Sequence, residues 1–261
     1  MASYTFTTVG SGSYSKPASI TKLVIECWGG GGSAFGNDGS KNGGGVGGQY
    51  AKKTITYPTA NMIIPYIVAA GGSTVDIGDG YSRGTSGGDS IWDNGQVVAK
   101  GGAAGNAIAT GSENVSYKTG SIEGGVGDIV YKGGSGVVVI NNAVVGHAGG
   151  GGAGSTGNGN DATIAEVIGV TGSYGGLAKD DFGGAGADGQ TATAPQPGKN
   201  GSNYGGGGGG GTLGQTVGLG AQGLIRITEY TETAFYINQI DNSTPATIND
   251  TIGVNSLIFY R

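Results

Sequence analysis

The pattern of apolar and polar positions predicts an opening region of antiparallel β-strands. Residues 4–8 alternate as Tyr-Thr-Phe-Thr-Thr, and the apolar run 20–28 is typical of a strand that stops at a row of glycines. Residues 50–57 and 62–70 are further strand candidates. Because proline cannot donate to a β-ladder, Pro65 predicts an edge position or a bulge within the last run. No segment combines a helical period with caps, so we expect an all-β protein with negligible α-helix.

A hairpin-like unit occurs twice in the middle of the chain. Residues 90–98 place apolar residues on both sides of Asn-Gly, which is typical of a tight hairpin turn. Residues 137–145 repeat this pattern around Asn-Asn, and a glycine tract follows each unit. Two copies are fewer than a solenoid requires. We therefore interpret the units as hairpins that lead into glycine-rich segments.

Glycine dominates the composition, with 62 of 261 residues. Each costs about 0.5–1 kcal/mol more than alanine to order in a regular element, so close packing must offset this cost. Glycine tracts can form extended helices with three residues per turn, and without Cβ atoms such helices can approach until their backbones contact. We predict that the tracts pack as polyglycine II helices, with glycine-rich surface loops between ordinary strands as the alternative. The glycines assigned this structural role are Gly29, Gly30, Gly31, Gly32, Gly43, Gly44, Gly45, Gly149, Gly150, Gly151, Gly152, Gly205, Gly206, Gly207, Gly208, Gly209, Gly210 and Gly211.

Charge and cysteine content exclude several classes of protein. Only 12% of residues are charged and the net charge is −5, which offers no basic surface to nucleic acid or to an anionic membrane. The single Cys27 cannot form an internal disulfide. Six prolines and irregular glycine spacing exclude collagen. No apolar run approaches the length of a membrane span, so we expect no membrane insertion. From the charge, we expect no nucleic-acid binding.

Signals for catalysis, cofactors and metals are weak. His147 is the only histidine, and no nucleophile elbow or phosphate-binding loop accompanies it. Residues 183–190 nearly match a calcium-binding nonapeptide, but Gln190 replaces the aliphatic residue and the motif does not recur. We therefore expect a protein that is not an enzyme and that has no cofactor and no metal site.

The segments between the glycine tracts contain aromatic and basic residues beside serine and glycine. This composition is also found in antibody loops, where tyrosine provides rigid contact area at a low cost in entropy. We predict that these segments bind a receptor, with solvated loops as the alternative. The candidate residues are Tyr81, Arg83, Tyr117, Tyr174 and Tyr204.

In the order of its strands and glycine tracts, the chain resembles the glycine-rich domain of tailed-phage tail fibres. The resemblance covers about residues 5–230, and it is carried by the order of the strands and glycine tracts in segments 24–32, 47–56, 67–73, 87–91 and 218–227. The tip adhesins of T-even-like phages are similar in theme, since glycine-rich motifs stack there as polyglycine helices and loops between them recognise the host. The resemblance implies a location on the virion surface, on a tail fibre or on the capsid exterior.

We expect one glycine-rich domain with an additional C-terminal segment. Residues 1–105 would form its β-rich part, and residues 106–230 would close the same domain with hairpins and glycine tracts. Residues 231–261 contain one glycine, and they are interpreted as a strand pair or as an arm that docks on other virion proteins.

The sequence thus predicts a non-enzymatic phage virion protein that binds a host cell-surface protein or glycan through the loops between its glycine tracts. One alternative is a purely structural head or tail decoration protein. A second alternative is an ice- or polysaccharide-binding protein. Whether the chain forms a homo-oligomer stays open at this point.

Overall fold

The computed structural model describes residues 1–35, 43–78, 81–105, 116–118, 122–139, 147–167, 170–180, 182–189, 197–211 and 216–231. Residues Met1–Thr231 form one compact unit. The expected C-terminal strands or arm lie outside the described residues, apart from Thr231. The prediction of an all-β fold is confirmed for the described residues, whose only helical element is the short 3₁₀ turn η1 (Asp93–Gly95).

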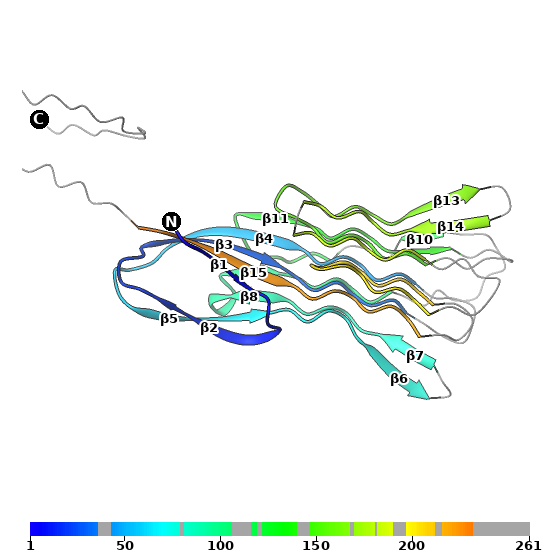
Figure 1. Cartoon of the computed structure of the whole chain (residues 1–261), viewed down its shortest axis with the longest axis horizontal. Coiled ribbons are helices and arrows are strands. Elements are labelled where there is room, and N and C mark those ends of the chain that lie inside the picture. Colours follow the sequence, from blue (N-terminus) through cyan, green and yellow to red (C-terminus); the bar gives the residue numbers. More distant parts are fainter. Residues whose placement is uncertain are drawn as a thin grey trace, which may run out of the picture. The chain divides into compact units, whose positions relative to one another are not determined.

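Two antiparallel sheets build one end of this unit (Figure 1). The five-stranded sheet has the order β1 (Ser3–Phe6), β15 (Leu224–Tyr230), β3 (Lys22–Trp28), β4 (Tyr50–Thr56) and β11 (Ile129–Tyr131). The four-stranded sheet has the order β2 (Gly10–Lys16), β5 (Met62–Val68), β8 (Ser90–Trp92) and β9 (Val97–Ala99).

A hydrophobic core fills the space between the two sheets. On β3, Leu23, Ile25 and Cys27 are fully buried at alternate positions, as expected for one face of a strand. Trp92 of β8 joins the same core, and its indole N–H donates to the Tyr57 hydroxyl at 3.1 Å. The alternating apolar positions of the sequence therefore correspond to the face of β3 that is buried in this core.

Pro65 lies in an interior strand, so the prediction of an edge position or a bulge is wrong. β5 pairs along its whole length with β2, where Pro65 faces Ser13 without a register shift. On its other side, β5 pairs with β8 only at Tyr66 and Ile67. Pro65 itself therefore has no described strand partner on that side.

The first predicted hairpin is present, with β8 and β9 joined through η1. Asp93, Asn94 and Gly95 all have positive φ there, which the Asp-Asn-Gly sequence accommodates. In the second unit, β12 (Val137–Val139) pairs with β10 (Ser116–Lys118). Residues 140–146 lie outside the described part, so the second hairpin stays a prediction.

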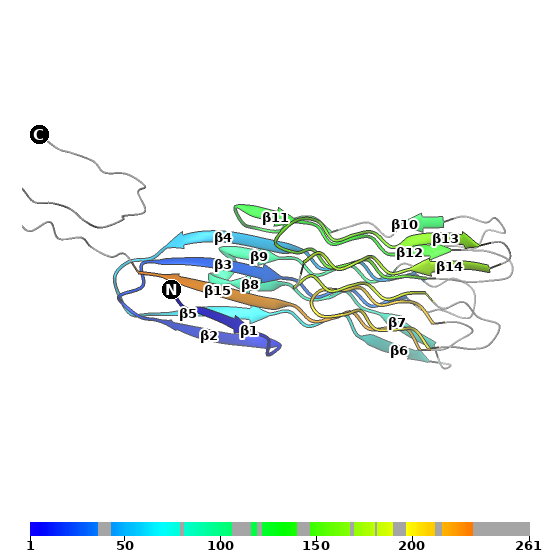
Figure 2. The same cartoon turned by 45° about the horizontal axis from the view of Figure 1, so that its top comes forward.

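Glycine-rich segments continue from the sheets as a packed bundle (Figure 2). We use the name glycine bundle for residues 29–34, 43–49, 69–73, 85–88, 100–105, 133–136, 147–153, 175–177, 183–187, 198–202, 205–211 and 217–223. Its segment 29–34 continues β3, and its segments 43–49 and 217–223 lead into β4 and β15. The sheets therefore fix where these segments enter the glycine bundle.

Backbone hydrogen bonds in the glycine bundle repeat every three residues. Along residues 29–34, the N–H groups at 29 and 32 donate to Gln49 and Val46, at 2.9 Å each. Those at 30 and 33 donate to Gly88 and Thr85, both at 3.1 Å. Those at 31 and 34 donate to Ala221 and Gly218, at 2.8 and 3.0 Å. Three donor directions per turn are what a threefold extended helix presents.

The carbonyl groups of the same segment reach other neighbours. Gly30 and Ser33 accept from Gly102 and Gly105, while Gly31 accepts from Gly72 and Gly32 from Gly208. The segment is thus bonded on all sides to strips of backbone that are distant in the sequence. This is the hydrogen-bonding pattern of polyglycine II, and it differs from a β-strand, which bonds to two neighbours.

Close approach of the backbones requires glycine in the glycine bundle. A methyl group at Gly31 would overlap the carbonyl oxygen of Gly206, and one at Gly207 would overlap that of Gly45. By contrast, a methyl group at Gly88 would meet its nearest neighbour, the Ala70 nitrogen, at 3.4 Å. Steric tolerance therefore differs sharply from one glycine of the bundle to another.

We expect Gly207→Ala to destabilise the protein by about 1–3 kcal/mol because it overpacks a backbone contact. For a domain of this size, that loss lowers the melting temperature by about 3–10 °C, which differential scanning calorimetry would measure. The matched control is Gly88→Ala, for which we expect little change or a slight gain. Equal melting temperatures for the two variants would contradict the packed arrangement.

Candidate binding surface at the end of the glycine bundle

Three two-stranded ribbons lie at the end of the glycine bundle away from the sheets (Figure 1). They are β6 (Thr74–Gly78) with β7 (Tyr81–Gly84), β10 with β12, and β13 (Thr163–Val167) with β14 (Val170–Tyr174). The second view places them at the same end (Figure 2). Four of the five predicted binding residues, Tyr81, Arg83, Tyr117 and Tyr174, belong to these ribbons.

The glycine bundle holds the base of the β6–β7 ribbon. The Ser33 hydroxyl lies 2.9 Å from the Ser73 carbonyl and 3.0 Å from the Thr85 carbonyl, and can donate to either. Thr85 N–H also donates to the Ser73 carbonyl at 2.8 Å, which closes the ribbon. The ribbon therefore starts from a fixed backbone position.

Arg83 presents an exposed cation on this ribbon. Its guanidinium lies 5.8 Å from the centre of the Phe35 ring, within reach of a cation–π contact. It faces Val75 across the ribbon, and Val75 is 50% exposed. Arginine and an apolar neighbour thus form an amphipathic surface that is open to solvent.

The β13–β14 ribbon carries Tyr174 in a comparable position. Tyr174 is 51% exposed and faces Thr163 at the base of the ribbon. The next residue is anchored, because Gly175 N–H donates to the Asp188 carboxylate at 2.9 Å. Tyr81 faces Gly78 and Tyr117 faces Val138 in their ribbons, and the side chains of these two tyrosines lie outside the described part.

Tyr204 does not join the other four residues. It is partly buried against the cluster of Trp28, Tyr50 and Leu224, at the end of the glycine bundle next to the sheets. Its carbonyl accepts from Gly184 N–H at 2.6 Å. The sequence prediction placed Tyr204 among the binding residues because the sequence beside a glycine tract does not show which end of the glycine bundle it occupies.

A buried polar network that the sequence did not indicate lies near Tyr204. Glu26 is 5% exposed and accepts from the Tyr50 hydroxyl at 2.7 Å and from Arg226 at 2.9 Å. The Arg226 guanidinium lies 4.7 Å from the Phe182 ring centre and 5.5 Å from that of Trp28. The pKa of the Tyr50 hydroxyl is raised, mainly by burial and secondly by the hydrogen bond to Glu26. The groups of the network bind one another, so it holds strands β3, β4 and β15 and the Phe182 ring together and does not form an open site.

His147 is fully buried within the glycine bundle. Neither ring nitrogen has a hydrogen-bond partner among the described residues, and burial lowers the pKa of the imidazole to about 3. Its ring packs against the backbone of Gly210, where an added methyl group would lie 2.8 Å from the histidine Cβ. The side chain therefore serves as a neutral packing group.

The described residues contain no cluster of three or more histidine, cysteine or acidic residues. In the nonapeptide-like segment, the Asp188 carboxylate is bound to Gly175 and lies 3.7 Å from the Lys199 amine. Within the described ranges, no helix could cross a bilayer.

A model of the glycine-rich domain family matches residues 7–230, so the chain belongs to this family. No curated protein matches the chain. The family match covers the glycine bundle and every strand of the two sheets except β1, and its description carries no activity or partner.

His147 generates a pH prediction. Its pKa is about 3 in the folded protein against 6.5 for an ordinary histidine, so the unfolded chain binds the proton more tightly. Stability is therefore lost as the pH falls below 6.5, by about 2–3 kcal/mol at pH 4.5.

The measurement is the free energy of unfolding in urea for wild type and His147→Gln between pH 7 and pH 4.5. Other titrating groups cancel in the difference, because both proteins contain them, and no second histidine titrates in this range. The advantage of wild type over the variant should shrink on acidification. Parallel pH curves for the two proteins would contradict a buried, neutral His147.

Proposed function

We propose that this protein is a non-enzymatic virion surface protein that attaches a phage to its host through the ribbon end of the glycine bundle. The observation that carries the proposal is the gathering of three ribbons at one end of a densely hydrogen-bonded support. Binding residues commonly lie on loops that a rigid scaffold positions. The resemblance in strand and tract order to tail-fibre domains provides the virion context.

The physical reason for such a support is entropic. Segments held by backbone hydrogen bonds in several directions do not have to be ordered when a ligand binds, so less free energy is lost on binding.

The exposed side chains favour a host cell-surface protein or glycan as the ligand. Arg83 and Tyr174 combine apolar area with a polar tip, and both residue types are enriched at the energetic centres of interfaces. Tyrosine rings also stack on the apolar faces of sugars. Nucleic acid is a poor ligand for this protein, whose net charge is −5.

We expect Arg83→Ala and Tyr174→Ala each to weaken adsorption to host cells by about five- to thirtyfold, equivalent to about 1–2 kcal/mol. Tyr81→Ala and Tyr117→Ala complete the set. The control is Tyr4→Ala, because Tyr4 is a tyrosine of similar exposure, 44%, on a strand of the five-stranded sheet.

Adsorption of labelled protein to host cells would be measured beside the melting temperature of each variant. Variants that fold normally and adsorb less than the Tyr4 control support attachment through the ribbon end. Unchanged adsorption for all four ribbon variants would favour a structural decoration protein instead.

Residues 231–261 are assigned to docking on other virion proteins, because their composition departs from that of the glycine-rich domain. A chain ending at Thr231 should keep its melting temperature, since Met1–Thr231 is a compact unit, and should fail to assemble into particles. An aggregated truncated protein would show instead that the segment belongs to the core.

A further inference from the structure

Asparagine followed by glycine is a chemically labile pair of residues. The backbone nitrogen of the glycine can attack the carboxamide carbon of the asparagine, and glycine has no Cβ to hinder the approach. The chain contains four such pairs, at residues 42–43, 94–95, 158–159 and 200–201. The structure describes both members of the last three pairs, so their surroundings can be compared.

Two of these pairs are held by the same arrangement of hydrogen bonds. In the Asn158–Gly159 pair, the carboxamide oxygen accepts from Lys132 N–H at 2.9 Å, and the glycine N–H donates to the Lys132 carbonyl at 2.8 Å. In the Asn200–Gly201 pair, Leu219 provides the same two partners, each at 2.9 Å. We call these two pairs clamped, because the attacking and the attacked group are both bound to a neighbouring segment.

The Asn94–Gly95 pair has no clamp. Asn94 is exposed in the turn η1 between β8 and β9, and its carboxamide has no hydrogen-bond partner among the described residues. The backbone around it is open, since a methyl group added at Gly95 would meet only the Val98 side chain within 4 Å, at 3.9 Å. The turn therefore leaves room for the backbone rotation that brings the Gly95 nitrogen to the Asn94 carboxamide.

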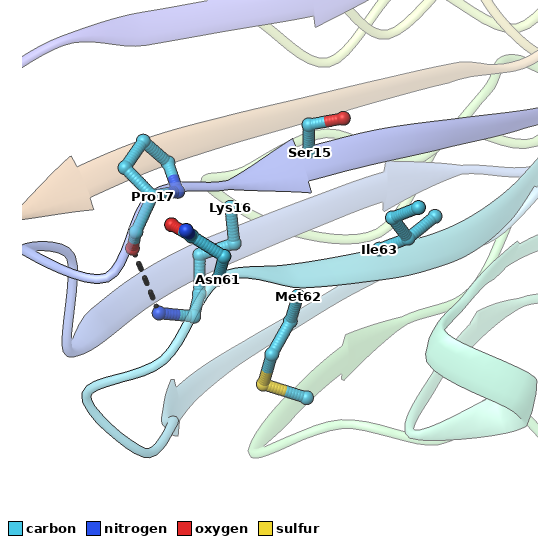
Figure 3. A pocket seen from close by; sticks show the side chains of 6 residues that line it. All are labelled: Ser15, Lys16, Pro17, Asn61, Met62 and Ile63. Carbon is cyan, nitrogen blue, oxygen red and sulfur yellow. Dashed lines mark hydrogen bonds between the residues drawn. The ribbon is translucent and has the colours of Figure 1, made fainter.

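Exposure to solvent does not separate Asn94 from the other asparagines. The asparagines of both clamped pairs are exposed as well. Asn61, which lines a groove with Lys16 and Met62 (Figure 3), is also exposed, and its carboxamide oxygen accepts from Ala18 N–H at 2.9 Å. The difference is that the Asn94 side chain is not held.

We infer that Asn94 is a site of spontaneous deamidation in the folded protein, whereas the clamped pairs keep their amides. The Gly95 nitrogen gives its proton to a solvent base and forms a bond to Cγ of Asn94. The bond between Cγ and the carboxamide nitrogen breaks, and ammonia leaves a five-membered succinimide ring. Water then opens the ring at either carbonyl, which yields aspartate or isoaspartate without any oxidant or cofactor.

The reaction changes the charge and the backbone of the turn. It adds a carboxylate next to Asp93, which already accepts from the Tyr57 hydroxyl at 2.9 Å. The isoaspartate product also lengthens the main chain of the β8–β9 hairpin by one carbon atom. An ageing sample thus becomes a mixture of three forms. The inference does not depend on the proposed function, because the turn belongs to the four-stranded sheet and not to the ribbons.

The test follows each pair in the folded, full-length protein by peptide mapping and mass spectrometry during incubation at pH 8. Asn94 should convert roughly 10–100-fold faster than Asn158 and Asn200, because a clamped pair reacts only after two hydrogen bonds have opened. In water enriched in heavy oxygen, the product should carry one heavy oxygen atom, and fragmentation should reveal isoaspartate beside aspartate. The melting temperature checks that the protein stays folded.

The control is the same chain in concentrated urea, where the clamps are absent and the three pairs should convert at similar rates. Asn94→Gln should keep the melting temperature and prevent the acidic form from accumulating in the folded protein. A folded protein in which Asn94 converts no faster than the clamped pairs would overturn the inference. So would an advantage of Asn94 that is equally large in urea, because the local sequence and not the fold would then set the rates.

Discussion

The absence of Cβ atoms is the constraint on which this structure depends. A β-strand bonds to neighbours in one plane, whereas a glycine-rich segment can bond to backbones on every side. Segment 29–34 does so with strips of chain that come from both halves of the sequence. The entropic cost of ordering so many glycines is thereby offset by hydrogen bonds and close contacts that other residues would prevent.

The sheets make the glycine bundle possible by setting its starting positions. β3, β4 and β15 are adjacent in one sheet, and each is continuous with a glycine-rich segment. The register of these strands therefore sets the alignment of the glycine-rich segments that continue them. The Glu26–Arg226 pair also contacts Phe182, whose ring lies against the guanidinium and which directly precedes the segment 183–187 of the glycine bundle. A side-chain core at one end thus organises a backbone core that has almost no side chains.

Strands were predictable from the sequence wherever one face is buried. The alternation in residues 20–28 and the turn signal at Asn94-Gly95 correspond to β3 and to the β8–β9 hairpin. Pro65 misled because the extent of the β8 pairing is a tertiary property that the local sequence does not carry. Tyr204 was misplaced for a related reason: the residues that flank a glycine tract do not reveal which end of the glycine bundle they occupy. The neighbours of each glycine segment could not be predicted either, because tracts of the same residue carry no sequence difference that would specify which tracts pack together.

The position of β15 in the chain has a consequence for biosynthesis. This strand, Leu224–Tyr230, lies between β1 and β3, so the five-stranded sheet lacks an interior member until residue 230 has been synthesised. The segment 217–223, which bonds to residues 31 and 34, also emerges late from the ribosome. Folding of the domain therefore waits for its last strand and is dominated by distant contacts, which are slow to form. Until then, the nascent chain is a polymer rich in glycine whose unpaired strands depend on the final part of the domain for their partners.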